Sequence, residues 1–236
     1  MNSDYFYFKQ FKLRNRDSSF KVNTDGVLLA AWANVDDDLT VLDIGTGTGV
    51  IPLMLSQKNP NLVITAVEIQ EDSYNEALFN FQLNDKRIEI HHCPVQEFAK
   101  SKIKFDHIVS NPPYFQNSTK PSISGLNTSK HNAKLSFESL WDSIDKLSHS
   151  KSIVSVIIPF DKFDKFDILA KALDYSLTRL CRVKSRAHTE WIRILLEYKK
   201  DMNNPVIEDE MYLQDEGRNN WSESYRKLTK DFYLNS

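Results

Sequence analysis

The nine residues LDIGTGTGV (42–50) decide the fold of this chain. They read as the end of an apolar strand, a turn with glycine at every second position, and the start of the apolar segment VIPLMLSQK (50–58). Glycines allow backbone N–H groups to approach a ligand closely, and the N-terminus of a following helix favours negative charge. We therefore expect a strand, a ligand-binding loop and a helix, in this order.

This loop does not fit the dinucleotide-binding pattern G-x-G-x-x-G/A. Val50 stands where that pattern requires a small residue. Asp43 lies inside the turn, where a carboxylate repels a pyrophosphate but suits a cofactor with an ammonium group. The next predicted strand ends on Glu68, where an acid can accept hydrogen bonds from both hydroxyls of a ribose.

Strands and helices alternate on both sides of the loop. Apolar runs and helical periodicity predict strands over 40–45, 62–68, 87–93, 105–110, 152–159, 177–185 and 191–199, and helices over 24–33, 50–58, 71–84 and 162–173. This order is typical of an α/β fold with a doubly wound, mostly parallel sheet, here of seven strands. The short loop between the last two strands predicts an antiparallel pair at the sheet edge.

The bulk composition excludes several classes of protein. The 236 residues carry a net charge of −2, which argues against a wholly basic nucleic-acid binder. No apolar run is long enough to cross a membrane, and the N-terminus has no signal-peptide core. Cys93 and Cys181 are too few and too isolated for a disulfide framework or a zinc site. We therefore expect a cytoplasmic protein with no metal.

The chain length and charge distribution indicate one domain with local basic patches. We expect a single domain over 1–236, made of an N-terminal arm and helix (1–39), a catalytic core (40–200) and a C-terminal extension (201–236). Basic residues gather over 9–21 and 179–200. Such patches on a nearly neutral protein are compatible with RNA binding, although each patch alone is also compatible with an ordinary solvated surface.

The pattern Asp–x–Gly–x–Gly–x–Gly, with an acid at the end of the next strand, resembles the class I S-adenosylmethionine-dependent methyltransferases. The resemblance implies a Rossmann-like sheet whose last strand is antiparallel, and S-adenosyl-L-methionine as the cofactor. It assigns roles to five residues: Gly45, Gly47 and Gly49 around the cofactor, Glu68 at its ribose and Asp43 at its methionine end.

The resemblance is weaker at the adenine end of the cofactor. This family often has an aspartate just after the third strand, close to the adenine. Pro94 stands at that position here, and Gln96 or Glu97 are the alternatives.

The second signal is NPPY (111–114), directly after the predicted strand 105–110. Two prolines stiffen the chain and hold Asn111 and Tyr114 at the carboxyl edge of the sheet, where open α/β sheets bind ligands. The motif resembles that of amino-methyltransferases acting on adenine, guanine or glutamine nitrogens, which also places Asn111 beside the cofactor. The Asn111 side-chain oxygen and the Pro112 carbonyl can each accept one N–H of a planar amine, which draws the nitrogen toward tetrahedral geometry and frees its lone pair. Tyr114 can stack on a flipped base.

The ends of the chain narrow the choice of acceptor. FKQF (8–11), FKVNTDGVLLAAWA (20–33), WIRILLEY (191–198) and NWSESYRKLTKDFYL (220–234) resemble the bacterial valine-tRNA adenine-N6-methyltransferases, which act at nucleotide 37 beside the anticodon. The resemblance implies the anticodon loop of valine tRNA as the partner, with no obligate protein partner. It assigns substrate-binding positions to Lys21, Thr24 and Asp25 near the pocket and to Lys130 and His131 along the RNA backbone. For Thr24 and Asp25 a simple helix N-cap is an equal alternative.

Other functions share the same two motifs. An N5-glutamine methyltransferase usually has an N-terminal helical domain, but only about forty residues precede the first core strand here. A ribosomal guanine-N2 methyltransferase also fits, as does a noncatalytic RNA-binding module, against which the intact Asp43, Glu68 and NPPY argue. The polar stretch between Phe115 and Phe137 is predicted to be a lid that orders on RNA.

The NPPY interpretation predicts the effect of one substitution. Asn111→Ala should abolish methyl transfer and leave the affinity for S-adenosylmethionine nearly unchanged, because the asparagine acts on the acceptor amine mainly in the transition state. Single-turnover methylation and calorimetric titration of the cofactor measure the two effects separately. Near-normal turnover of this variant would show that the assigned role is wrong.

Overall fold

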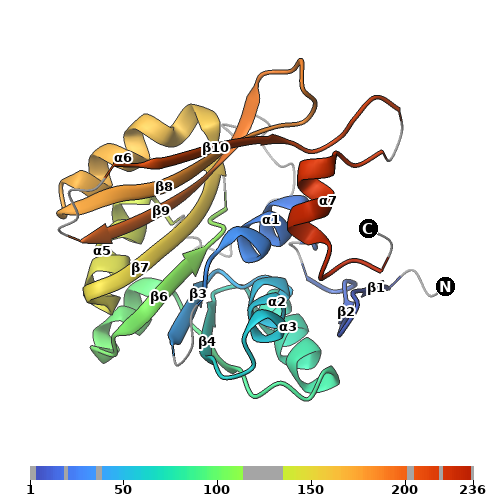
Figure 1. Ribbon diagram of the computed structural model, residues 1–236. Coiled ribbons are helices and arrows are strands. Elements are labelled where there is room, and N and C mark those ends of the chain that lie inside the picture. Colours follow the sequence, from blue (N-terminus) through green and yellow to red (C-terminus); the bar gives the residue numbers. More distant parts are fainter. Residues whose placement is uncertain are drawn as a thin grey trace, which may run out of the picture.

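The computed structural model describes residues 4–18, 21–35, 39–113, 135–200, 205–217 and 220–234 (Figure 1). Its strands are β1 (Tyr5–Tyr7), β2 (Lys12–Arg14), β3 (Thr40–Ile44), β4 (Val63–Glu68), β5 (Glu89–His92), β6 (Phe105–Ser110), β7 (Ser148–Pro159), β8 (Tyr175–Lys184), β9 (Trp191–Lys200) and β10 (Ile207–Tyr212). Its α-helices are α1 (Thr24–Trp32), α2 (Val50–Lys58), α3 (Glu71–Leu83), α4 (Val95–Phe98), α5 (Phe137–Leu147), α6 (Phe163–Lys171) and α7 (Glu223–Thr229). Two short 3-10 turns cover Ala99–Ser101 and Phe160–Lys162.

The central sheet has eight strands in the order β10-β8-β9-β7-β6-β3-β4-β5. Strands β5, β4, β3, β6 and β7 run parallel to one another, and β9 runs antiparallel between β7 and β8. The predicted seven-stranded Rossmann-like arrangement with an antiparallel last member is therefore confirmed. The eighth strand, β10, pairs in parallel with β8 and covers it, so the antiparallel β8–β9 pair does not form the sheet edge.

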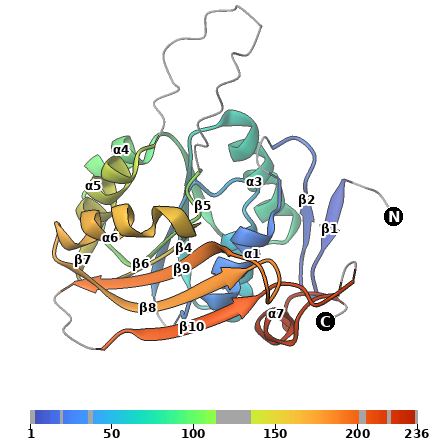
Figure 2. The same cartoon turned by 90° about the horizontal axis from the view of Figure 1, so that it is seen from above.

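Helices cover both faces of this sheet (Figures 1 and 2). One apolar core joins α1, α2, α3 and α7 to the sheet, and a second core joins α4, α5 and α6 to the other face. The second core centres on Trp141, whose ring contacts Phe166, Tyr175 and Tyr198. The sequence analysis did not identify α5 or β10, since both lie in segments dominated by polar residues.

The N-terminal arm is fastened to α3 by buried polar groups. Arg14 pairs with the fully buried carboxylate of Glu76 at 2.9 Å, and the Asp17 N–H donates to the same carboxylate at 2.7 Å. Asn80 accepts from the Arg14 N–H at 2.7 Å and donates to the Thr48 carbonyl at 2.9 Å. The arm is thus linked through α3 to the loop that follows β3.

The arm also contacts the last part of the chain. Phe8 forms a β-bridge with Tyr233, and the two rings stack at 5.7 Å between centroids. The Lys9 N–H donates to the Phe232 carbonyl at 2.7 Å. Phe8, Phe11 and Phe232 are all buried in the core that contains α1 and α2.

The loop between β3 and α2 has the backbone that its glycines permit. Gly45, Gly47 and Gly49 have φ of 75°, 57° and 83°, in the left-handed region that other residues rarely adopt. At Gly49, a Cβ atom would lie 2.5 Å from Cε1 of the buried Phe81 ring. This glycine is therefore required both by its backbone and by the close approach of α3.

We expect Gly49→Ala to lower the free energy of unfolding more than Gly217→Ala does. Both residues have positive φ, which costs alanine about 1–2 kcal/mol, but a Cβ at Gly217 would have no atom of the described residues within 4 Å. The overpacking against Phe81 should cost a further ~1–3 kcal/mol. Urea unfolding of the two variants measures the difference, and equal losses would mean that Phe81 moves aside without cost.

Candidate active site

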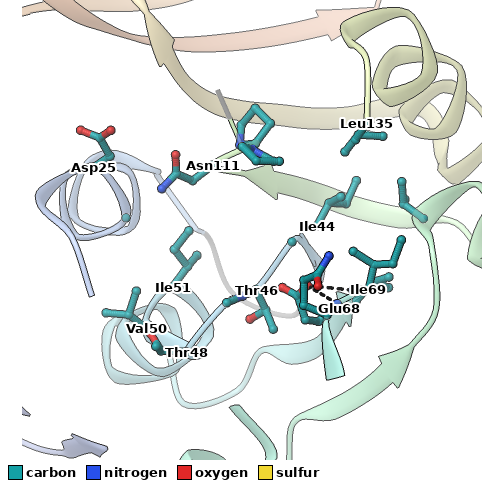
Figure 3. A pocket seen from close by; sticks show the side chains of 18 of the residues that line it. Asp25, Ile44, Thr46, Thr48, Val50, Ile51, Glu68, Ile69, Asn111 and Leu135 are labelled. Atoms are coloured by element: carbon teal, nitrogen blue, oxygen red, sulfur yellow. Dashed lines mark hydrogen bonds between the residues drawn. The ribbon is translucent and has the colours of Figure 1, made fainter. Parts of the chain in front are cut away.

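A pocket of about 830 Å³ opens at the carboxyl ends of β3, β4 and β6 (Figure 3). Its size falls in the range of small-molecule sites. One end is formed by the glycine loop and the residues after β4 and β5, and the other end by α1, the start of β9 and the segment after β6. The residues relevant to binding that line it are Lys21, Asn23, Thr24, Asp25, Gly45, Thr46, Gly47, Glu68, Gln70, Pro94, Gln96, Asn111, Pro112, Pro113 and Arg193.

Glu68 ties the glycine loop to the end of β4. Its Oε2 accepts from the Gly47 N–H at 2.9 Å, and its Oε1 accepts from the Ile69 and Gln70 N–H groups at 2.8 Å each (Figure 3). Burial raises the pKa of the Glu68 carboxyl, although these N–H groups act in the opposite direction. A carboxylate has about four acceptor positions. With three occupied, one ordinary position remains, on Oε2, for a donor in the pocket.

Asp43 lies deeper than the sequence analysis expects. Its side chain is fully buried at the end of β3, behind the glycine loop, and does not line the pocket. Neither carboxyl oxygen accepts a hydrogen bond from the residues that the structure describes. Burial raises the pKa of Asp43 to about 7; Thr46 lowers it in part, and the Glu68 carboxylate adds to the rise. The protein thus buries an acid that has no positively charged partner among the described residues. A bound cationic group would supply that partner.

Asn111, Pro112 and Pro113 form the wall of the pocket after β6. Ser110 anchors them, because its hydroxyl donates to the Ile44 carbonyl on the neighbouring strand at 3.0 Å. Figure 3 shows the Asn111 side chain extending toward α1, the helix that carries Asp25. Tyr114, Lys130, His131 and the predicted lid lie outside the described residues.

The wall opposite Asn111 comes from α1 and β9. Lys21, Thr24 and Asp25 all line the pocket. The N-cap of α1 is Asn23, whose side chain accepts from the Gly26 N–H at 2.9 Å, so Thr24 and Asp25 are not the cap. Asp25 pairs instead with Arg193 Nε at 2.7 Å.

The sequence analysis missed Arg193 as a pocket residue. The first residues of an antiparallel strand lie at the same edge as the carboxyl ends of the parallel strands. The position of an arginine near the start of the predicted strand WIRILLEY (191–198) could therefore have identified it as a pocket residue.

At the adenine end predicted from the sequence, Pro94 and Gln96 line the pocket and Glu97 does not. The Gln96 Nε2 donates to the Ser139 hydroxyl at 2.8 Å, which fixes the amide on the pocket wall. The remaining neighbours are mostly apolar and include Ile44, Val67 and Val95. An apolar wall with one amide is suited to a purine ring.

The fold and this pocket define a class I S-adenosylmethionine-dependent methyltransferase. Residues 18–126 match the family model of the methyltransferase small domain. Among solved structures, a predicted O-methyltransferase from Agrobacterium tumefaciens superposes with a TM-score of 0.70 over 88% of this chain and 96% of its own, at 16% identity. A type I restriction-modification methyltransferase subunit from Streptococcus thermophilus gives a TM-score of 0.64 over 91% of this chain and 52% of its own, also at 16% identity. These two likenesses concern the fold alone.

Curated relatives of full length share a single description. A tRNA1(Val) (adenine(37)-N6)-methyltransferase from Pseudoalteromonas translucida is 39% identical over 97% of this chain and 98% of its own. One from Phocaeicola vulgatus is 39% identical over the whole of both chains, and one from Flavobacterium johnsoniae is 35% identical over 97% and 99%. This chain belongs to the family of tRNA1(Val) (adenine(37)-N6)-methyltransferases.

Two features are absent from the part of the chain that the structure describes. No helix there has both the length and the apolar character needed to cross a bilayer. No group of three or more His, Cys, Asp or Glu side chains in the same residues could hold a metal ion.

The raised pKa of Asp43 predicts how pH affects stability. Between the ordinary aspartate pKa of 3.8 and the folded value of about 7, the folded protein holds a proton that the unfolded chain has lost. The free energy of unfolding should therefore fall as pH rises across this interval, by on the order of a few kcal/mol from this group. In Asp43→Asn this contribution disappears. Urea unfolding at pH 5 and pH 8 should show the variant gaining stability relative to the unsubstituted protein at the higher pH.

The two proteins are compared by how much the free energy of unfolding changes between pH 5 and pH 8, so a pH-independent cost of burying the asparagine amide cancels. If the stability of both proteins changes equally between pH 5 and pH 8, Asp43 does not titrate in this range.

The Asp43→Asn variant should also bind S-adenosylmethionine more weakly, because the buried site then offers no negative charge to its ammonium group.

Proposed function

We propose that this protein methylates the N6 amine of adenosine 37, next to the anticodon, in a valine tRNA. The observation that supports this most directly is the position of Asn111 and Pro112 on the wall of the pocket, opposite Asp25 and facing the same space as Glu68. That arrangement provides two acceptors for an exocyclic amine beside a cofactor loop. The full-length relatives named for this reaction supply the acceptor.

The cofactor end of the pocket fits S-adenosylmethionine, which supplies a methyl group on a positively charged sulfur when bound. Gly45 leaves space for a ligand, since no atom of the described residues lies within 4 Å of where its Cβ would be. The open acceptor position on Glu68 Oε2 would hold one ribose hydroxyl, and the Gln96 amide would contact the adenine edge. Asp43 supplies negative charge from behind the glycine loop.

The acceptor end of the pocket activates the target amine without a strong base. The Asn111 side-chain oxygen and the Pro112 carbonyl each accept one N–H of the adenine amine, and this draws its nitrogen out of conjugation with the ring. The lone pair is then free for a methyl donor; S-adenosylmethionine, if bound at the other end of the pocket, would supply the methyl group, and the methylated nitrogen would give up one proton to water. Much of the acceleration comes from holding amine and methyl group in line.

The remaining proposals concern the chain as a whole. We propose one domain over 1–236, because the arm, the core and the C-terminal segment share one apolar cluster. We also propose that the reaction uses no metal, and that the protein works in the cytoplasm on the anticodon loop. Tyr114 is proposed to stack on the flipped adenine, and Lys130 and His131 to contact the RNA backbone.

The function predicts a nucleotide-specific product. Incubation with unmodified valine tRNA and S-adenosylmethionine should yield one N6-methyladenosine per tRNA by nucleoside mass spectrometry. A transcript with guanosine at position 37 should yield none, since it lacks the amine at that position of the purine. A transcript with the neighbouring adenosine replaced, where one is present, serves as the matched control.

Two outcomes would contradict the proposed target nucleotide or the proposed acceptor. N6-methyladenosine in the position-37 variant would show that another adenosine is the target. Absence of tRNA methylation, together with transfer to a glutamine or to a ribosomal guanine, would favour the other amino-methyltransferases that share NPPY.

A further inference from the structure

Cationic side chains lead outward from the pocket along β9 and the β8–β9 hairpin loop. Arg193 lines the pocket, and a register shift in the β8–β9 pair places Trp191 on the opposite face, where its ring centre lies 6.2 Å from that of Phe160. Lys184 is the cross-strand partner of Trp191, and its Nζ lies 4.1 Å from the centre of the indole ring. Arg186 follows in the loop, which rises clear of the sheet in Figure 1. We call Lys184, Arg186 and Trp191 the hairpin row.

Most cations in the two basic segments of the sequence are occupied within the protein. Arg14 pairs with Glu76, Arg16 with Asp17, Arg179 with Glu197 and Arg182 with Glu208. In contrast, neither Lys184 nor Arg186 pairs with a carboxylate in the part of the chain that the structure describes. In the arm, the Lys9 and Lys21 ammonium groups donate to backbone carbonyls. The hairpin therefore carries one of the two groups of basic charge available for a ligand, and the lysines of the arm form the other.

Acidic groups near the hairpin reduce this charge without cancelling it. Glu190 is exposed in the loop, Glu216 pairs with His188 at 3.5 Å, and Asp25 neutralises Arg193.

The hairpin loop is held in one shape by its own hydrogen bonds. The Thr189 hydroxyl accepts from the Arg186 N–H at 3.1 Å and lies 3.0 Å from the Ser185 hydroxyl. The Thr189 N–H donates back to the Arg186 carbonyl at 3.1 Å. The segment after β10 braces the base of the loop, since the Leu213 and Gln214 N–H groups donate to the Lys184 and Ser185 carbonyls at 3.0 Å. Cations on a preorganised loop lose less freedom on binding.

We propose that the hairpin row is the docking surface for the single-stranded RNA that flanks the target nucleotide. Lys184 and Arg186 contact its phosphates, and Trp191 is a positioning residue that holds the Lys184 ammonium over its ring. This inference rests on the proposed function and adds the direction from which the anticodon loop enters. A target base in the pocket beside Arg193 brings the adjoining strand over β9 and the hairpin.

The test compares two double variants that remove the same charges. Lys184→Ala/Arg186→Ala removes the cations of the hairpin row. Lys86→Ala/Arg87→Ala removes a lysine and an arginine just before β5, at the opposite edge of the sheet. Binding of unmodified valine tRNA is measured by fluorescence anisotropy over a range of salt concentrations, with calorimetric titration of S-adenosylmethionine as the check on folding.

The hairpin variant should bind tRNA roughly tenfold more weakly near 0.1 M salt, and its log–log salt slope should fall by about 1–2. Its affinity for S-adenosylmethionine should not change, and the control variant should match the unsubstituted protein. Trp191→Leu should raise KM for tRNA with little effect on kcat, and Trp191→Phe should restore most of the loss because a phenyl ring still attracts the ammonium.

Other results would overturn the inference. Equal weakening in both double variants would mean that only net charge matters, and unchanged binding in the hairpin variant would mean that the RNA follows another path. In both cases the unsubstituted protein still methylates tRNA, so the proposed function stands. If the unsubstituted protein binds S-adenosylmethionine but neither binds nor methylates tRNA, the proposed function fails and the inference fails with it.

Discussion

A backbone turn that only glycine can make easily organises this molecule. The left-handed conformations at Gly45, Gly47 and Gly49 turn the chain from the end of β3 into α2 and expose backbone N–H groups at the carboxyl edge of the sheet. Glu68 fixes one of these groups, and the absence of a side chain at Gly49 lets the Phe81 ring of α3 pack against the turn. Through Asn80, α3 then carries the N-terminal arm. The cofactor loop, the neighbouring helix and the arm therefore form one connected unit.

The two ends of the pocket serve different chemical needs. The end formed by the glycine loop contains two acids, with Glu68 bonded by three N–H groups and Asp43, behind the loop, left without a hydrogen-bond partner among the described residues. The acceptor end is rigid rather than charged, because two prolines fix the backbone that follows β6. Its only close ion pair among the described lining residues, Asp25 with Arg193, is neutral overall.

Local sequence signals predicted the centre of the fold and failed where distant segments meet. The seven predicted strands and the glycine loop depend on apolar runs and on single-residue backbone preferences, which are visible in a short window. Arg193 reaches the pocket only because β9 inserts antiparallel between β7 and β8, and β10 is a strand only because β8 offers it an edge. The density of cations over 9–21 suggested a surface for RNA, but Glu76, the acid that pairs with Arg14, lies 62 residues away. Buried pairing of this kind is not visible in composition.

The contact between the two ends of the described chain has a consequence for biosynthesis. Lys9 donates to a carbonyl 221 residues later, and Phe8 and Phe11 complete their burial against Phe232 and its neighbours. A ribosome releases the arm early and the segment that covers it late. The aromatic residues of the arm must therefore remain uncovered through most of translation, when chaperones have access to them. The arm can close against Phe232 only after this late segment has been synthesised.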